Sequence, residues 1–537
     1  MKRIAVRIGF TLGLALLSLP QSGPRQPADS ATLYRHHFAG TARIAQAPNS
    51  STLRKVWALP ESKALRDHVF LKLAEVPYRV RRPELPAGAA DQSALFRPLL
   101  DDLFSAESYL EIRGPTQRSE VVLALKLGDD RARVWSTNLW QAGATWKLGA
   151  PAPIKVEGFP GWELKMKGAP NVFQWVRAGQ WLLVGLGHDR LTLLPGLARQ
   201  TAKSERPGTA LEQNWFEADV DCPRLSSWFP VLGRYAVPPA HVVITAKGEM
   251  LRSTAQLRCP EKVTWTFEPW KLPTNYIHEP LISFTVAQGI AHLLAKTKGV
   301  PELGLKPLPN QVCLWGQAAE HVQTAFTVPT ANATNVIRQL APRLQPFVLS
   351  HMPGAIGEFE WITNMLGMHW KGVPFVLPTL RPVRDTGVEY LLGSLYPVGT
   401  KGKPVPAELY AQLAGQTNLL YYDWEMTSER LPQANRFLQL GSITTQKRLP
   451  PTNAPTLRWL KAVSPLLGNT GTKMTQTGPN ELTLVRSSQL GLTGIEMATL
   501  TRWIESPGFP LTFDPPPSSL PSPRKDSGKP ASPRPQR

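Results

Sequence analysis

Three carboxylates at alternate positions are the first residues in this chain whose spacing could support chemistry. They lie in the segment 215–222 and are Glu217, Asp219 and Asp221. In a β-strand, alternate side chains lie on one face, roughly 7 Å apart, where they could bind a hard cation or divide acid and base roles. A second alternating segment, 251–259, carries Arg252 and Arg258 on its polar face. We therefore predict cross-strand ion pairs between the two segments, and no metal or catalytic site.

The two segments also end in cysteines, Cys222 and Cys259, each on the apolar side of its strand and each followed by proline. If the strands lie parallel in one sheet, their ends meet. A disulfide would then close a loop of about 37 residues and contribute at most about 4 kcal/mol in the loop-entropy model. Two unpaired buried thiols are the alternative, because free cysteine behaves as a small apolar residue. Both interpretations stay open, and Cys313 is expected in a buried strand.

Tryptophan is unusually frequent, with 17 residues in the chain. Aromatic rings at a surface stack on sugars and are favoured at protein interfaces. Trp140 and Trp146 lie among Gln141, Gly143 and Thr145, which favour a loop, so they are the predicted partner-binding surface. The other interpretation is that tryptophans fill the space between helices and sheet.

Signatures of familiar enzymes are absent from the sequence. It contains no G-x-S-x-G, H-E-x-x-H, C-x-x-C or phosphate-loop motif. Gly468 to Lys473 has two glycines and a lysine, but the spacing differs from a phosphate loop and we expect a turn. His36 and His37 are adjacent, so in a strand they point to opposite faces and cannot hold one ion together. No cofactor is predicted.

Hydrophobic periodicity predicts alternating helices and strands. The expected helices are 60–75, 189–203, 290–297, 332–349, 428–440 and 455–466. The expected strands are 121–126, 132–136, 154–165, 172–187, 215–222, 251–259, 281–288, 311–316 and 321–328, with more between 357 and 396. This mixture indicates an α+β fold with antiparallel or mixed sheets and packed helices.

A faint internal repeat predicts two similar lobes, at 31–270 and 271–512. Trp135-Ser-Thr-Asn138 is matched by Trp361-Ile-Thr-Asn364, and Asn214-x4-Asp219 by Asn418-x4-Asp423. Each match is followed by a second shared landmark, and the order of landmarks is the same in both lobes.

The two ends of the chain differ in composition from its body. Residues 1–30 combine a basic start with an apolar run of 12 residues, which predicts a signal peptide and an exported protein. No later stretch is apolar enough to predict a membrane-spanning helix. Residues 513–537 are rich in proline and basic residues, so we expect a disordered cationic tail.

Composition limits the function further. The net charge of +20 favours anionic partners, but no basic cluster interleaves with aromatic residues as a nucleic-acid site would. With 42% hydrophobic and 19% charged residues, the chain has enough apolar material for a core. We expect an exported, non-enzymatic protein that binds an anionic polymer, glycan or envelope protein. The alternatives are a hydrolase acting on an anionic polymer and a carrier of lipid or another apolar ligand.

Overall fold

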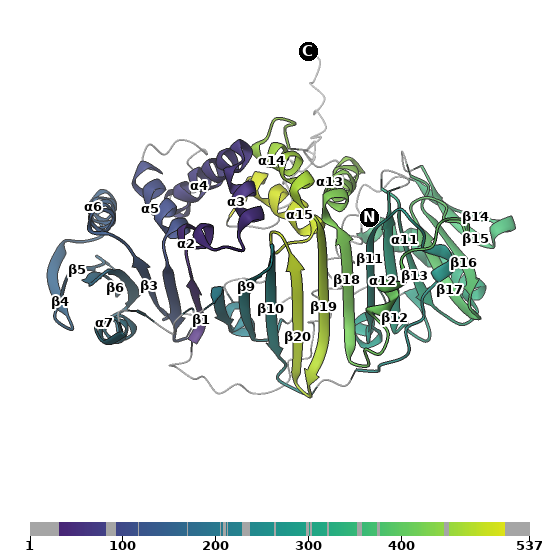
Figure 1. Ribbon diagram of the computed structural model, residues 1–537, viewed down its shortest axis with the longest axis horizontal. Helices are drawn as coiled ribbons and strands as arrows, with labels where there is room; N and C mark the ends of the chain where they lie inside the picture. The colour runs from purple at the N-terminus through teal and green to yellow at the C-terminus, as the bar shows by residue number, and fades with distance from the viewer. Residues whose placement is uncertain are drawn as a thin grey trace, which may run out of the picture.

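The computed structural model describes a defined part of the chain, within which the expected α+β fold is confirmed. This part is residues 32–510 except 82–92, 116–117, 169, 205, 208–210, 212, 228–236, 263–264, 297–299, 301–302, 319–321, 352–356, 373–375 and 445–449. Helices surround one antiparallel sheet of 20 strands (Figure 1). The predicted signal peptide and tail lie outside the described residues. None of the described helices combines the length and apolar character needed to cross a bilayer.

The N-terminal half of the described chain supplies half of the sheet. Its strands are β1 (Thr32–Phe38), β2 (Ser108–Arg113), β3 (Glu120–Lys126), β4 (Pro151–Val156), β5 (Phe159–Lys165), β6 (Asn171–Ala178), β7 (Trp181–His188), β8 (Asn214–Val220), β9 (Ala240–Lys247) and β10 (Met250–Arg258). Its helices are α2 (Thr41–Gln46), α3 (Ser51–Ala58), α4 (Pro60–Arg81), α5 (Ser93–Ser105), α6 (Asp129–Thr145), α7 (Leu193–Ser204) and α8 (Cys222–Leu225).

The C-terminal half supplies the remainder. Its strands are β11 (Leu281–Gln288), β12 (Gln311–Gln317), β13 (Thr324–Pro329), β14 (Glu358–Ile362), β15 (Gly367–Lys371), β16 (Thr379–Asp385), β17 (Val388–Ser394), β18 (Leu419–Met426), β19 (Asn469–Gly478) and β20 (Glu481–Ser488). Its α-helices are α10 (Ala291–Lys296), α11 (Ala333–His351), α12 (Ala407–Ala411), α13 (Thr427–Thr444), α14 (Pro455–Val463) and α15 (Gly494–Glu505). Short 3₁₀ turns are η1 (Thr274–Tyr276), η3 (Thr363–Met365) and η4 (Ser464–Leu466).

The strand pairings give one continuous order across the molecule. It runs β4-β5-β6-β7-β3-β2-β1-β8-β9-β10 and continues β20-β19-β18-β11-β12-β13-β17-β16-β15-β14. Counted outwards from the β10–β20 pair, the strands of the two halves come in the same order. β9 corresponds to β19, β8 to β18, β1 to β11, and so on to β4 and β14 at the two edges. The two predicted lobes share one sheet and meet at the β10–β20 pair.

Two irregularities in the ladders fall at matching places in the two halves, whereas one at Thr477 in β19 has no counterpart in β9. The extra residue is Leu33 in β1 and Ile282 in β11, where each strand pairs with the next one, β2 or β12. A second is Trp215 in β8 and Leu420 in β18. Because an extra residue moves every later side chain to the other face, the position of these bulges fixes which faces correspond.

The sequence landmarks for a repeat fit this arrangement only in part. Trp135 lies in α6, whereas Trp361 lies in β14, so the first pair falls on different elements and that match is wrong. Asp219 and Asp423 do fall on the corresponding strands β8 and β18. However, Asp219 is four residues after its bulge and Asp423 three after its own, so they face opposite sides of the sheet.

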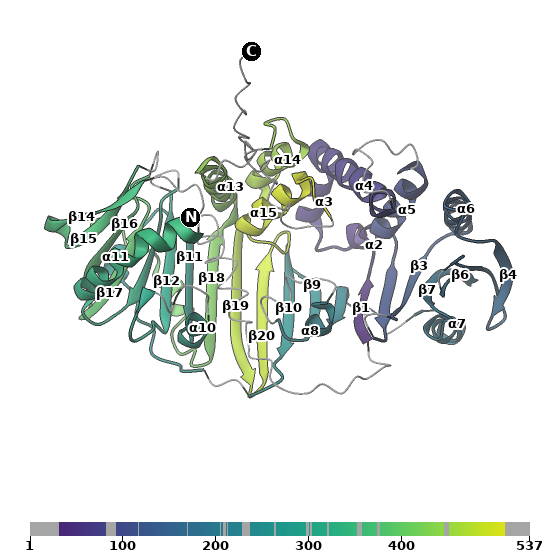
Figure 2. The same ribbon diagram turned by 180° about the vertical axis from the view of Figure 1, so that it is seen from behind.

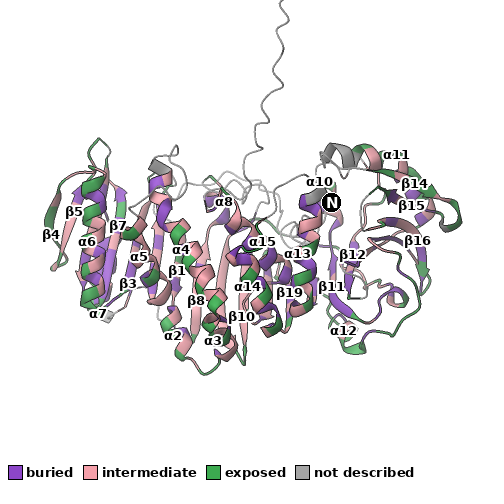
Figure 3. Cartoon of the chain, turned by 90° about the horizontal axis from the view of Figure 1, so that it is seen from above, coloured by how far each residue is buried: buried purple, intermediate pink, exposed green. Residues whose placement is uncertain are grey.

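Helices cover the two faces unequally. α7 packs on Ala124 and Leu183, while α6 packs Trp135 on their neighbours Leu125 and Leu182, so these helices lie on opposite faces. We call the first the α7 face. α12 lies on this same face and is drawn in front in Figure 1, whereas α8 and α10 stand in front in Figure 2. Figure 3 shows that exposed residues gather on the outer sides of the helices.

Some predicted elements were wrong. The predicted strand 132–136 is part of α6, whose first turn carries Asp129 and Asp130 at the positive end of the helix dipole. The predicted strands 154–165 and 172–187 are each a hairpin, because Gly158 and Gly179 adopt positive φ angles of 84° and 59° at their turns. The predicted turn at 468–473 instead opens β19.

Candidate functional site

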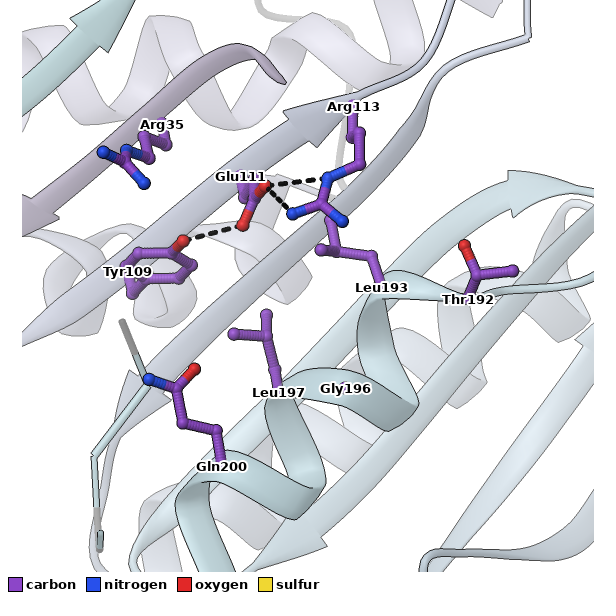
Figure 4. Close-up of a pocket in the computed structure, with 9 residues that line it drawn as sticks. All are labelled: Arg35, Tyr109, Glu111, Arg113, Thr192, Leu193, Gly196, Leu197 and Gln200. Carbon is purple, nitrogen blue, oxygen red and sulfur yellow. Dashed lines mark hydrogen bonds and ion pairs between the residues drawn. The ribbon is translucent and has the colours of Figure 1, made fainter. Parts of the chain in front are cut away.

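A cavity of about 350 Å³ opens on the α7 face between β1, β2 and α7 (Figure 4). Its lining residues are Arg35, Tyr109, Glu111, Arg113, Thr192, Leu193, Gly196, Leu197 and Gln200. All of them belong to the N-terminal half. The site therefore does not depend on contacts between the halves.

Strand geometry explains how the polar wall forms. Tyr109, Glu111 and Arg113 alternate along β2, so their side chains share one face. Arg35 on β1 lies directly opposite Glu111 and joins them. Leu193 and Leu197 of α7 form the apolar wall across the cavity, as Figure 4 shows.

Glu111 anchors the centre of this wall. Its side chain is only 5% exposed. One oxygen, Oε1, accepts hydrogen bonds from Arg113 Nε at 3.0 Å and Nη2 at 2.6 Å and from Thr32 at 3.1 Å. The other accepts from the Tyr109 hydroxyl at 2.7 Å. Burial, together with this bond to a carboxylate, raises the pKa of Tyr109, so its hydroxyl stays protonated. Both carboxylate oxygens therefore have hydrogen-bond donors, and Oε1 holds Arg113 in a fixed orientation.

Arg35 is held in a similar way from the neighbouring strand. Its Nε donates to Asp219 of β8 at 2.6 Å, and His241 of β9 contacts the other oxygen of Asp219 at 2.9 Å. Burial acts to raise the pKa of Asp219, but these two contacts outweigh it and lower that pKa. Asp219 therefore remains an anion and fixes the direction of the Arg35 guanidinium.

Donors remain for a ligand. Within the described chain, Nη1 and Nη2 of Arg35 and Nη1 of Arg113 have no hydrogen-bond acceptor, and the two side chains are 51% and 42% exposed. By contrast, Glu120 accepts from the backbone N–H groups of Thr192, Leu193 and Leu194, so the first turn of α7 is already capped. The available chemistry is that of two guanidinium groups, which suit carboxylate, phosphate or sulfate oxygens.

A second charged cluster lies on the opposite face, beneath α13 and α15. Asp423 and Glu425 alternate on β18 and are 9% and 3% exposed. Asp423 accepts from Thr285 at 2.6 Å, and Glu425 accepts from the Gly494 N–H at 2.7 Å and from Thr427 at 3.0 Å. Burial raises both pKa values, that of Glu425 to about 7 with the help of the Asp423 charge.

Arginines complete this second cluster. Arg486 of β20 binds Glu496 of α15 through two bonds of 2.6 and 3.0 Å, and its Nε donates to Thr472. Burial lowers the pKa of Arg430, which contacts Gln433 within α13. The bonds to Gly494 and Glu496 fix the first turn of α15 against the sheet. We therefore interpret the cluster as a structural connection, although a carboxyl with a pKa near 7 is typical of acid–base sites.

The predicted carboxylate row is rearranged by a strand that the sequence patterns missed. β9 lies between β8 and β10, so Arg252 and Arg258 are not neighbours of Glu217, Asp219 and Asp221. Asp219 pairs with Arg35 instead, and Asp221 caps α8 by accepting from the Arg224 N–H at 3.1 Å. The predicted ion pairs between the two segments are wrong. Among the described residues, no group of three potential ligands could hold a metal ion.

Cys222, Cys259 and Cys313 are all free and buried. β8 and β10 do run parallel, but with β9 between them. Cys222 and Cys259 belong to one hydrophobic cluster that also contains Trp265 and Leu293. The structure therefore has the unpaired alternative, and burial raises the pKa of both thiols to about 11.

The predicted tryptophan surface separates into two environments. Both residues lie at α6 rather than in a loop, Trp140 within the helix and Trp146 at its C-cap. Trp140 is 51% exposed. Trp146 stacks on Phe96 at 5.6 Å between ring centroids and meets Tyr78 edge-on at 5.3 Å. A partner role for either residue stays a prediction.

Sequence reasoning missed both clusters. The available signal was the alternation of polar residues, Tyr109-x-Glu111-x-Arg113 and Tyr421-x-Asp423-x-Glu425, inside short strands. Comparison of the chain with protein-family models, with curated proteins and with solved structures finds no match.

Proposed function

We propose that the protein is an exported, non-enzymatic binding protein that holds an anionic group of its partner between Arg35 and Arg113. The observation that carries the proposal is the cavity in which both guanidinium groups keep unused N–H donors. Glu111 and Asp219 orient the two arginines in advance, which lowers the entropic cost of binding. The apolar wall of Leu193 and Leu197 would contact a less polar part of the ligand.

The ligand group is a carboxylate, phosphate or sulfate. Arg35 can offer two parallel N–H bonds to such an anion through Nη1 and Nη2, and Arg113 can add a bond from Nη1. The net charge of +20 supports the same class, because a cationic protein concentrates anions near its surface.

Thermal unfolding with added ligand tests the proposal. Galacturonate, phosphate and sulfate should each raise the melting temperature of the wild-type protein, since a ligand bound only by the native state stabilises it. Arg35→Gln should lose that increment, and it leaves Asp219 a contact with His241. Arg199→Gln is the matched control, because Arg199 is a similarly exposed arginine paired with Glu157 outside the cavity.

Phosphate and sulfate also stabilise proteins without binding, through exclusion from their surfaces. The decisive quantity is therefore the difference between variants at equal salt. If Arg35→Gln and wild type gain the same stability from all three anions, the pocket is not the binding site and the proposal is wrong.

We also infer that the two halves are duplicated units, 31–270 and 271–512. Support comes from the matching strand order and from the paired bulges at Leu33 and Ile282 and at Trp215 and Leu420. Two separate chains with these bounds, co-expressed with a tag on one, should purify together through the β10–β20 pair. Recovery of the tagged half alone and unfolded would contradict two such units.

A further inference from the structure

Among the described elements, no helix covers the α7 face from the pocket across the middle of the sheet. Arg35 lies opposite Asp219, Asp219 opposite His241, His241 opposite Gln256 and Gln256 opposite Thr483. Residues directly opposite each other in an antiparallel pair share a face. In Figure 1, β10, β20 and β19 face the viewer between α7 and α12.

We define the central face by Lys247, Arg252, Lys473, Thr245, Thr254 and Ser487. Register places all six on the α7 side of β9, β10, β20 and β19. Each of them is exposed or half-buried, whereas Met474 and Leu482 on the reverse side are fully buried. The central face is therefore open, and it is polar apart from Val243 and Val485, which flank Thr254 on the same side.

The cations of this face lack anionic partners. Within the described residues, Lys247, Arg252 and Lys473 form no ion pair, and Lys473 contacts only the Gln412 amide oxygen at 3.0 Å and the Tyr422 ring. Glu217 and Asp219 lie toward the pocket and are hydrogen-bonded to Asn214 and to Arg35 with His241. Glu481 lies at the far end of β20 opposite Arg258 and accepts a hydrogen bond from Thr477. The central face thus presents positive charge that the protein itself leaves uncompensated.

Charge spacing indicates the kind of polyanion that fits. From strand spacing and rise per residue, the Cα atoms of Lys247 and Arg252 are about 8 Å apart, and those of Arg252 and Lys473 are about 12 Å apart. Double-stranded DNA carries a charge about every 1.7 Å along its axis, and single strands usually add aromatic rings for base stacking. The six residues of the central face include no aromatic ring. They do include the hydroxyl groups of Thr245, Thr254 and Ser487, to which no partner is assigned in the described chain.

We infer that the partner is an acidic polysaccharide, one of whose carboxylates or sulfates occupies the Arg35–Arg113 pocket while the chain continues over the central face. This rests on the proposed function and extends it to a substrate class. Sugar rings separate the charges of such a polymer widely enough for isolated cations. The free hydroxyls of threonine and serine can exchange hydrogen bonds with sugar hydroxyls.

Binding of polygalacturonate and of monomeric galacturonate to the full chain tests the inference. The triple variant Lys247→Gln, Arg252→Gln, Lys473→Gln should bind the polymer roughly tenfold more weakly at low salt, because each exposed cation contributes a modest amount. Its affinity for the monomer should equal that of wild type. Lys63→Gln, Lys155→Gln, Lys461→Gln is the matched control, since it removes the same charge from exposed lysines elsewhere.

The outcomes separate the two proposals. Both the pocket and the polysaccharide inference are supported if Arg35→Gln loses monomer binding and if polymer binding is reduced in the first triple variant but retained in the control triple variant. Equal polymer affinity in the first triple variant and wild type would overturn the polysaccharide inference and leave the pocket standing. Monomer binding unaffected by Arg35→Gln would refute the pocket. Tighter binding of single-stranded DNA than of polygalacturonate, sensitive to the first triple variant, would replace the polysaccharide by a nucleic acid.

Discussion

The two charged clusters sit on corresponding strands of the two halves, yet one is open and the other enclosed. In the N-terminal half, Arg35 and Asp219 are 51% and 36% exposed beside a cavity. In the C-terminal half, Asp423 and Glu425 are 9% and 3% exposed beneath α13 and α15. The one-residue difference after the bulges of β8 and β18 turns Asp219 and Asp423 to opposite faces. The two halves therefore share a strand order but place these ionisable groups on opposite faces of the sheet.

The same contrast is visible at other corresponding positions. The pocket of the N-terminal half lies beneath α7, and the corresponding place in the C-terminal half lies beneath α12. That place is filled by an apolar cluster that includes Cys313, Trp315 and Phe284. The positions that form the polar wall of the pocket in the N-terminal half are thus apolar in the C-terminal half. The pocket is a feature of the N-terminal half, and the connection to α15 is a feature of the C-terminal half.

Breaking the enclosed cluster should give the largest effect. Arg486→Ala removes the two hydrogen bonds to Glu496, whose side chain is 24% exposed, and losing these charge-assisted bonds should cost about 2–3 kcal/mol of unfolding free energy. Arg133→Ala, which breaks a pair with Asp130 in which the side chains are 77% and 89% exposed, should cost less than about 1 kcal/mol. Urea denaturation measures both. Similar losses in the two variants would remove the distinction between enclosed and open clusters.

The pH dependence of stability should carry opposite contributions from the two halves. Burial raises the pKa of Glu425 from 4.5 to about 7, so the native state binds more protons than the unfolded state in that interval. Its contribution is present below about pH 4.5 and is lost as pH rises through 7. Burial lowers the pKa of His36 from 6.5 to about 4, so its contribution is present above pH 6.5 and is lost as pH falls toward 4.

Two variants isolate these contributions. Relative to Glu425→Gln, the wild type should lose roughly 2–3 kcal/mol of unfolding free energy between pH 4.5 and 7. Relative to His36→Phe, it should gain a similar amount between pH 4 and 6.5. Denaturant titrations at several pH values give both differences. Parallel pH profiles for Glu425→Gln and the wild type would show that this carboxyl is not protonated in the native protein near neutrality.

The smallest expected effects concern two tryptophans at α6, one exposed and one packed against other aromatic rings. Trp146→Ala removes contacts with Phe96 and Tyr78 and should cost about 2 kcal/mol of unfolding free energy. Trp140→Ala, at an exposed position, should change it by less than about 0.5 kcal/mol. A destabilisation by Trp140→Ala as large as that by Trp146→Ala would mean that Trp140 packs against the protein in solution.

Local patterns predicted many elements, because apolar runs and helix caps depend only on residues that are close together in the sequence. The predicted strand 281–288 coincides with β11, and the predicted helix at 60–75 is confirmed within α4. β1 was missed because Arg35, His36 and His37 interrupt its apolar pattern. β9 was missed as well, and with it the true neighbour of β8.

The sites depended on information that local patterns do not contain. Arg35 and Arg113 meet only because β1 pairs with β2 across four intervening helices. Asp423 and Glu425 would be expected at a surface from their type alone, but the packing of α13 and α15 over the sheet buries them. Long-range pairing and the cost of burying charge decide both clusters, and neither can be read from residue spacing.

The β10–β20 pair has a consequence for how the molecule is assembled. β10 ends at Arg258 and β20 begins at Glu481, so about 220 residues separate the two paired strands in the sequence. During synthesis these residues must be made before β20 can pair with β10. During that time β10 is an uncovered strand edge, the kind of edge on which chains associate wrongly. The seam at the centre of the sheet, and not its outer borders, is where an interrupted or shortened chain would be most prone to aggregate.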